Sequence, residues 1–177
     1  IDEYVANRVC ESDGIEVTKN GLVTNYNGSD KEVIIPEYKV IDNQDGTNTV
    51  VKITAISPTA FAGKDIKTVE ISNFVTEIPA HAFENCTSLT HVNALGVTKI
   101  GDCAFAGCTS IEELQVCEQI TELGENIVSD QTRLYVMATN KGVVESAVKS
   151  NAKSIAISIL DECTDLENTE LIVPSNV

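Results

Sequence analysis

Residues 97–107 read VTKIGDCAFAG, and related segments read ITAISPTAFAG at 53–63, VTEIPAHAFEN at 75–85 and ITELGENIVSD at 120–130. Successive segments start 22, 22 and 23 residues apart, at positions 53, 75, 97 and 120. Self-similarity at such a period is typical of a stacked array, in which each unit buries its apolar face against the next. The pattern therefore predicts a repeat solenoid, and not the core of a globular enzyme.

Each unit contains two apolar clusters, which predict short strands. The V-x-I pattern that opens a unit alternates with a period of two residues, as in a strand with one buried face. The Ala-Phe pair after it is too short for an ordinary helix, so we expect a single helical or 3₁₀ turn that points Phe inward. Strands of neighbouring units should lie about 4.8 Å apart, so equivalent side chains should touch. We expect an inner column of Phe61, Phe83 and Phe105, and an outer column of Thr54, Thr76, Thr98 and Thr121.

The segment before the repeats predicts a β cap. Residues 14–51 contain Asn20-Gly21, Asn27-Gly28 and Asp45-Gly46, which are hairpin turn signals between runs of β-forming side chains. An array needs a cap because its first coil would otherwise expose an apolar face. We therefore expect an N-terminal β cap over 1–51, followed by about four repeats of 22–23 residues over 52–138.

The segment after the repeats predicts a closing helix and strand. Asn140 can cap a helix that buries Val144, Ala147 and Val148, and SIAISIL at 154–160 predicts a strand. The tail ECTDLENTELIVPSNV resembles the repeat segment ENCTSLTHVNAL. We assign residues 139–177 to a C-terminal helix and strand cap with a candidate degenerate repeat.

Net charge and hydropathy limit the classes of partner that the chain is expected to bind. The chain of 177 residues carries a formal charge of −15, which repels nucleic-acid phosphates and anionic lipid headgroups. The sequence contains no run of 18 apolar residues, so it predicts no membrane-spanning helix. The first residues, IDEYVANRVCESDG, lack the basic and apolar regions of a signal peptide, so they are not predicted to be a leader.

The spacing of the six cysteines does not indicate a metal site or a redox site. They are Cys10, Cys86, Cys103, Cys108, Cys117 and Cys163. No C-x-x-C pair occurs, which counts against a structural zinc site or a redox motif. Cys86 and Cys108 share one repeat position, but parallel Cβ vectors make a disulfide between them awkward, so buried free thiols are favoured. We expect no metal and no cofactor, since His91 stands among scattered carboxylates only.

One catalytic hypothesis remains. His81 and Cys103 occupy matching positions in successive repeats, where stacking could make a Cys–His nucleophile pair. No third orienting group or oxyanion donor accompanies them, so we predict no catalytic residues.

The strand patterns V-E-I, V-N-A, L-Q-V and L-Y-V predict one row of outward side chains, namely Glu70, Asn93, Gln115 and Tyr135. Repeat arrays use such rows as binding faces, and an exposed Tyr can anchor a partner or stack on a sugar ring. The alternative is that the row is merely a solvated face.

The segment VTKIGDCAFAGCTSIEELQV at 97–116 resembles the repeat of the BspA-type leucine-rich repeat family. That unit runs approximately V-T-x-I-G-x-x-A-F-x-x-C-x-S-L-x-x-I-x-I. Other copies depart from it at Pro79 and Lys64, and the fourth copy lacks both Phe and Cys. The resemblance covers about residues 14–155. It implies a leucine-rich-repeat superhelix, a secreted or surface-attached bacterial protein, and a binding or adhesion role without catalytic residues.

We therefore predict a non-enzymatic binding module that recognises a protein or glycan ligand, host-derived in the adhesion case, along the repeat face. A structural spacer that presents other domains of a longer surface protein is the alternative. A thiol enzyme that uses Cys103 and His81 is the least favoured hypothesis.

Overall fold

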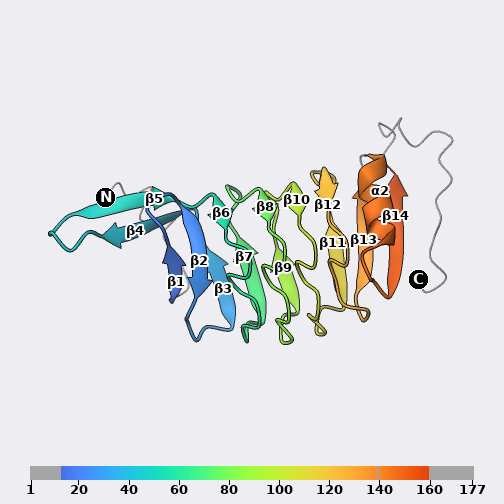
Figure 1. Cartoon of the computed structure of the whole chain (residues 1–177), viewed down its shortest axis with the longest axis horizontal. Helices are drawn as coiled ribbons and strands as arrows, with labels where there is room; N and C mark the ends of the chain where they lie inside the picture. The colour runs from blue at the N-terminus through green and yellow to red at the C-terminus, as the bar shows by residue number, and fades with distance from the viewer. Residues whose placement is uncertain (1–12, 139, 160–177) are drawn as a thin grey trace.

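The computed structural model describes residues 13–138 and 140–159, which form an elongated stack of strands (Figure 1). The N-terminal strands are β1 (Ile15–Val17), β2 (Leu22–Tyr26), β3 (Glu32–Ile35), β4 (Tyr38–Asp42) and β5 (Asn48–Lys52). The repeats supply β6 (Ala55–Ile56), β7 (Thr68–Ile71), β8 (Glu77–Ile78), β9 (His91–Asn93), β10 (Lys99–Ile100), β11 (Glu113–Val116), β12 (Glu122–Leu123) and β13 (Arg133–Ala138). The chain then forms α2 (Lys141–Val148) and β14 (Ser154–Ile159).

Each repeat contributes one short and one longer strand, which join two separate rows. The short strands β8, β10 and β12 pair in parallel, while β6 pairs with β2. The longer strands form two parallel sheets, in the orders β3-β7-β9 and β11-β13-β14. Apolar side chains of both rows point between them and form one continuous core. The predicted repeat solenoid is confirmed.

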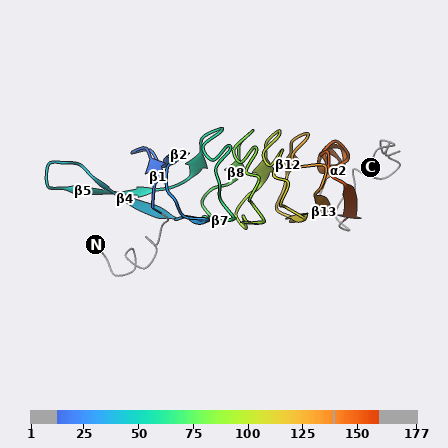
Figure 2. The same cartoon turned by 90° about the horizontal axis from the view of Figure 1, so that it is seen from below.

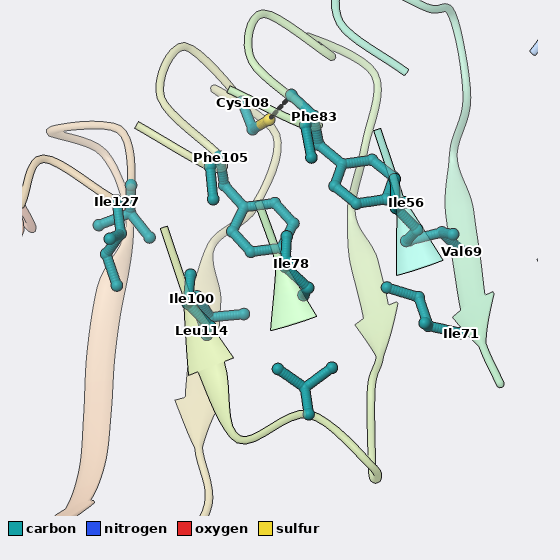
Figure 3. Close-up of a cluster of buried hydrophobic side chains, with 14 of the residues drawn as sticks. Ile56, Val69, Ile71, Ile78, Phe83, Ile100, Phe105, Cys108, Leu114 and Ile127 are labelled. Atoms are coloured by element: carbon teal, nitrogen blue, oxygen red, sulfur yellow. Dashed lines mark hydrogen bonds between the residues drawn. The ribbon is translucent and has the colours of Figure 1, made fainter. Parts of the chain in front are cut away.

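The predicted Phe column is the centre of this core. The rings of Phe61 and Phe83 stack with centroids 5.0 Å apart. Those of Phe83 and Phe105, shown in Figure 3, stack with centroids 5.5 Å apart. Tyr26 extends the stack at the N-terminal end, 5.8 Å from Phe61. In the fourth repeat Ile127 takes the place of Phe, and its carbonyl accepts a hydrogen bond from the Phe105 amide. The column therefore links all the repeats.

The predicted Thr column also forms. The side chains of Thr98 and Thr121 donate hydrogen bonds to the carbonyls of the equivalent Thr one repeat earlier, at 3.2 and 3.3 Å. These residues stand immediately before the short strands rather than within them. Each hydroxyl thus bridges two coils as well as facing outward.

The predicted helical or 3₁₀ turn at the Ala-Phe pair is wrong. These segments are successive hydrogen-bonded turns, because the residue before each Ala, or before Ile127 in the last repeat, has a left-handed backbone. The φ angles are 63° at Thr59, 60° at His81, 56° at Cys103 and 52° at Asn126. A right-handed helix requires consecutive negative φ angles, so it cannot run through these positions.

Two of the three predicted N-terminal hairpins are present. Asn20-Gly21 joins the antiparallel strands β1 and β2, with Gly21 at φ 80°, and Asp45-Gly46 joins β4 and β5. The β4–β5 hairpin extends away from the repeats (Figures 1 and 2). The hairpin expected at Asn27-Gly28 is wrong, because β2 pairs with β6 while β3 pairs with β7. The chain there turns from one row to the other, like the coils of the repeats.

The closing helix and strand are confirmed in position. The Asn140 side chain caps α2 by accepting a hydrogen bond of 3.0 Å from the Val143 amide. The buried face consists of Val143, Val144 and Ala147, whereas Val148 is only half-buried, so Val143 and not Val148 completes it. Strand β14 extends the sheet beside β13 in parallel. The candidate degenerate repeat, Cys10 and Cys163 lie outside the described residues, and the division at 51 and 138 stays a prediction.

Candidate binding face

The four predicted face residues lie on the longer strands as two pairs. Glu70 of β7 stands opposite Asn93 of β9, and Gln115 of β11 stands opposite Tyr135 of β13. Glu70, Gln115 and Tyr135 are exposed, and Asn93 is half-buried. Tyr135 is 41% exposed, so part of its ring is accessible from the surface. Their role in binding stays a prediction.

The expected continuous row is interrupted between these two pairs. Within the described ranges 13–138 and 140–159, no ladder joins β9 to β11, and the longer strands form two sheets instead of one. The short strands on the other side stay paired across the same two repeats, with Lys99 opposite both Glu77 and Glu122. The second and third repeats are therefore joined by a hydrogen-bonded ladder in the row of short strands, but not in the row of longer strands.

A missing residue explains the opening. Strand β9 has three residues where β7 and β11 have four, and the chain from Val92 to Val97 is one residue shorter than the equivalent stretches of the flanking repeats. The omitted residue corresponds to Ile71 of β7 and Val116 of β11, both buried. At its place the chain already turns, at half-buried Ala94, through a hydrogen bond from the Val97 amide to the Ala94 carbonyl.

Glycine permits the shortened turn. A Cβ at Gly96 would lie 2.4 Å from the carbonyl oxygen of Asn73 in the preceding coil, far inside normal contact distance. The compressed turn also leaves Leu95 with 65% of its side chain exposed, the largest exposed fraction among the described large apolar residues. The shortened segment therefore has one core side chain fewer than its neighbours, and it leaves Leu95 exposed.

A cavity of about 390 Å³ lies at this opening. Its wall combines the apolar side chains of Val92, Leu114 and Phe105 (Figure 3 shows the last two) with polar residues, among them His91 and Glu113. Three of the predicted face residues line it as well, namely Asn93, Gln115 and Tyr135. The sequence prediction missed the cavity, although the absence of one residue between Val92 and Val97 is a signal that could have located it.

The lining of the cavity includes one carboxylate, Glu113, and one imidazole, His91. Glu113 is held by Arg133 of the neighbouring strand, with Nη2 and Oε1 2.6 Å apart. Glu70, Glu112 and Glu118 are exposed, and no cation pairs with them within the described part of the chain. Glu113 lines the cavity, whereas Glu70, Glu112 and Glu118 are not among the residues that line it. The exposed Glu113–Arg133 ion pair contributes little stability.

The structure gives no support to the Cys103–His81 pair. The His81 ring bonds to the Glu84 carboxylate, with Nδ1 and Oε2 2.9 Å apart. Desolvation, together with the negative charges of Glu84 and Asp102, raises the pKa of Cys103 above its ordinary value. A nucleophilic thiol requires the opposite shift. The two residues share a column in which the backbone is left-handed in every repeat, with φ of 60° at His81 and 56° at Cys103.

Cys86 and Cys108 serve the core as free thiols. Each donates a hydrogen bond of 3.0 Å to the Phe carbonyl of the preceding repeat, Cys86 to Phe61 and Cys108 to Phe83 (Figure 3 shows the latter). The hydrogen bond with Cys86, together with burial, raises the pKa of Cys108 above its ordinary value. Cys117 is free and half-buried.

The described residues form neither a metal-ion cluster nor a membrane-spanning helix. No group of three or more His, Cys, Asp or Glu side chains there is arranged to hold a metal ion. In the same part of the chain, no helix has the length and apolar character needed to cross a membrane.

The family model of the BspA-type leucine-rich repeat region matches residues 54–177 in six copies. The match covers more than half of the chain. The chain belongs to the BspA-type leucine-rich repeat family. The resemblance of residues 97–116 to that family's unit is therefore confirmed, and the BspA-type match extends through the whole C-terminal part of the sequence. Among curated proteins, no sequence matches the chain.

Solved structures confirm the leucine-rich-repeat fold. A leucine-rich repeat protein from Bacteroides capillosus superposes with a TM-score of 0.60 at 22% identity, over 70% of this chain and 93% of that one. The pneumococcal vaccine antigen PcpA has a TM-score of 0.66 at 17% identity, over 93% of this BspA-type chain but only 40% of its own. A leucine-rich repeat protein from T. pallidum gives 0.54 at 18% identity, over 82% and 79%.

Proposed function

We propose that this chain is a non-enzymatic binding module of a secreted or surface-attached bacterial protein, and that it recognises a protein or a glycan along the face of Glu70, Asn93, Gln115 and Tyr135. The observation that carries the proposal is the exposed ring of Tyr135, beside Gln115 in the ladder. An exposed aromatic ring offers a large apolar surface with a polar tip, which suits both protein anchors and sugar rings.

Several observations support a binding role over an enzymatic one. The thiol of Cys103 has its pKa shifted in the unreactive direction, and His81 bonds to Glu84. The formal charge of −15 disfavours nucleic acids and anionic membranes as partners. The surface location is favoured by family membership and by the shared fold with a pneumococcal vaccine antigen.

A screen of the purified protein against glycans and extracellular-matrix proteins at physiological salt tests this function. We expect saturable binding that is weakened by Tyr135→Ala and by Glu70→Lys. The matched control is Tyr38→Ala, since Tyr38 lies in the β4–β5 hairpin away from the face. If both face variants bind every identified partner as the unaltered protein does, the face is wrong.

The spacer alternative rests on one specific observation. This chain covers only 40% of the pneumococcal antigen that it superposes on, so the same fold occurs as part of a longer protein. A spacer predicts no saturable ligand in the screen and a ligand for the remaining domains of the full-length protein. Either finding would favour the spacer over the binding module.

A further inference from the structure

The cavity between the second and third repeats has the size of a small-molecule pocket. Its volume of about 390 Å³ lies in the range of roughly 300–1,000 Å³ in which proteins bind such ligands. The two coils that form it stay joined by the Phe83–Phe105 stack and by the hydrogen bond from Ser110 Oγ to the Thr87 carbonyl. A ligand of this cavity is therefore smaller than a strand or a folded domain.

Polar side chains of three successive longer strands supply part of the lining. They are His91 and Asn93 of β9, Glu113 and Gln115 of β11, and Tyr135 of β13. Within residues 13–138 and 140–159, the side chains of His91, Asn93, Gln115 and Tyr135 make no hydrogen bond to another residue. Both amides therefore keep their donors and acceptors for a ligand.

Apolar surface lies directly beside these polar groups. Leu95 and Tyr135 are 65% and 41% exposed and both line the cavity, so two of the three exposed large apolar side chains of the described residues meet there. On the side away from β11, Tyr135 stands opposite Ala156, whose methyl group is too small to cover the ring. The site thus presents an accessible aromatic ring next to hydrogen-bonding groups.

The charge of the site excludes ionic ligands. Among the described residues that line the cavity, none is Lys or Arg. An anionic ligand would therefore find no cation there, and the net charge of −15 would repel it. A cationic ligand would meet one carboxylate, Glu113, which already pairs with Arg133. The ligand that suits this lining is uncharged.

We propose that the cavity binds one neutral sugar residue of a glycan, with the apolar face of the sugar ring on Tyr135 and its hydroxyl groups hydrogen-bonded to Asn93 and Gln115. A sugar ring meets both requirements, because its C–H groups pack on an aromatic ring while each hydroxyl both donates and accepts. An apolar side chain of a protein partner would instead cover the amides without giving them partners, which is unfavourable. This inference rests on the proposed binding function and narrows its ligand to an uncharged glycan.

An array of neutral oligosaccharides, each printed beside a sialylated counterpart, tests the inference on the whole chain. The neutral members are built from glucose, galactose, mannose and N-acetylhexosamines. We expect saturable binding to at least one neutral member and weaker binding to its sialylated counterpart. If no neutral member binds, or if the sialylated counterparts bind as tightly, the inference is wrong.

Isothermal titration calorimetry with the neutral oligosaccharide that binds most tightly then tests the side chains. Tyr135→Leu keeps an apolar side chain but removes the flat ring, so it should weaken binding at least about tenfold, whereas Tyr135→Phe should retain most of the affinity. Gln115→Leu removes the amide and should also weaken binding. Gln119→Leu, the same change at an exposed position outside the cavity, should leave binding unchanged. Equal affinity of Tyr135→Leu and Tyr135→Phe would overturn the inference.

NMR spectroscopy locates the sugar independently of these variants. The same oligosaccharide should shift the side-chain amide signals of Asn93 and Gln115 and leave that of Asn48, in the β4–β5 hairpin, in place. The inference falls if neither Asn93 nor Gln115 responds.

The outcomes also separate this inference from the proposed function. If matrix proteins bind, and Tyr135→Ala and Glu70→Lys weaken that binding while no neutral glycan binds, the binding function stands and only the sugar site is wrong. If neither glycans nor proteins bind saturably, the proposed function itself is wrong.

Discussion

Phe83 stacks on Phe105 with ring centroids 5.5 Å apart and ring planes inclined by only 12°. Both side chains are fully buried, and neighbouring repeats contribute one ring each. The contact therefore couples adjacent coils directly, in a fold where each coil meets only its neighbours.

Replacing Phe83 by Ala should lower the free energy of unfolding by about 3–5 kcal/mol, because it leaves a cavity between two rings. Phe74→Ala is the control, since Phe74 is half-buried and makes an edge contact with Tyr38 outside the column. Urea unfolding followed by circular dichroism measures both variants. A loss for Phe83→Ala no larger than that for Phe74→Ala would contradict the role of the stack.

The Phe column was predictable from sequence because a repeated pattern forces equivalent residues into register. The break at β9 was harder to predict, since the repeats that start at 53 and 75 both span 22 residues. Their lengths hide two compensating differences: Phe83 to Leu89 is one residue longer than Phe61 to Ile66, while Val92 to Val97 is one residue shorter than its equivalents. The period alone therefore concealed the missing strand residue, and with it the cavity.

Restoring the missing residue should close the opening. An isoleucine inserted between Asn93 and Ala94 would rejoin the aliphatic column and permit a ladder between β9 and β11. Burial of this side chain should raise the free energy of unfolding by about 2 kcal/mol. The control is a serine inserted at the same place, which restores the length without the apolar side chain.

Thermal unfolding and hydrogen exchange together test the insertion. The isoleucine variant should unfold at a higher temperature than the serine variant, and its β9 and β11 amides should exchange more slowly than in the unaltered protein. A lower unfolding temperature for the isoleucine variant than for the serine variant would show that the cavity is not an omitted core position.

Stability should decline in acid through two surface carboxyls. The side-chain hydrogen bond from Thr47 lowers the pKa of Asp45, and the hydrogen bond from Lys31 lowers the pKa of Asp65, each relative to 3.8. A pKa lowered by folding contributes stability that is present above 3.8 and is lost as the pH falls through the folded-state value. The unfolding temperature should therefore drop below pH 3.8 through these groups.

In the double variant Asp45→Asn and Asp65→Asn, the unfolding temperature should fall less steeply with decreasing pH than in the unaltered protein. Differential scanning fluorimetry across the acid range measures the difference. Protonation of other carboxyls relieves the repulsion within a chain of charge −15, so the comparison between the two proteins, and not the raw slope, is the decisive quantity. If the unfolding temperature fell equally steeply with decreasing pH in both proteins, the effect could not be assigned to Asp45 and Asp65.

The thiol of Cys103 should alkylate slowly in the folded protein. Desolvation and the nearby carboxylates of Glu84 and Asp102 raise its pKa, which lowers the thiolate fraction at neutral pH. Iodoacetamide labelling followed by mass spectrometry should show slower modification of Cys103 than in the urea-unfolded chain. Glu84→Gln should accelerate labelling by removing one charge. If Cys103 were labelled faster in the folded protein than in the unfolded chain, and if His81→Ala removed this difference, the result would instead support a thiol–imidazole pair of Cys103 and His81.

Closure along only one row also has a mechanical consequence. Across the second and third repeats, the short strands β8, β10 and β12, the turn hydrogen bonds and the Phe stack carry the connection, while the longer strands β9 and β11 add no ladder. A load that pulls the two ends of the array apart is shared by fewer hydrogen bonds at this junction than where both rows are paired. The junction between the first and second repeats is also laddered in one row only, since β7 pairs with β9 while β6 and β8 form no ladder within the described part of the chain. The array should therefore bend at these two junctions, about the longer strands at the first and about the short strands at the second.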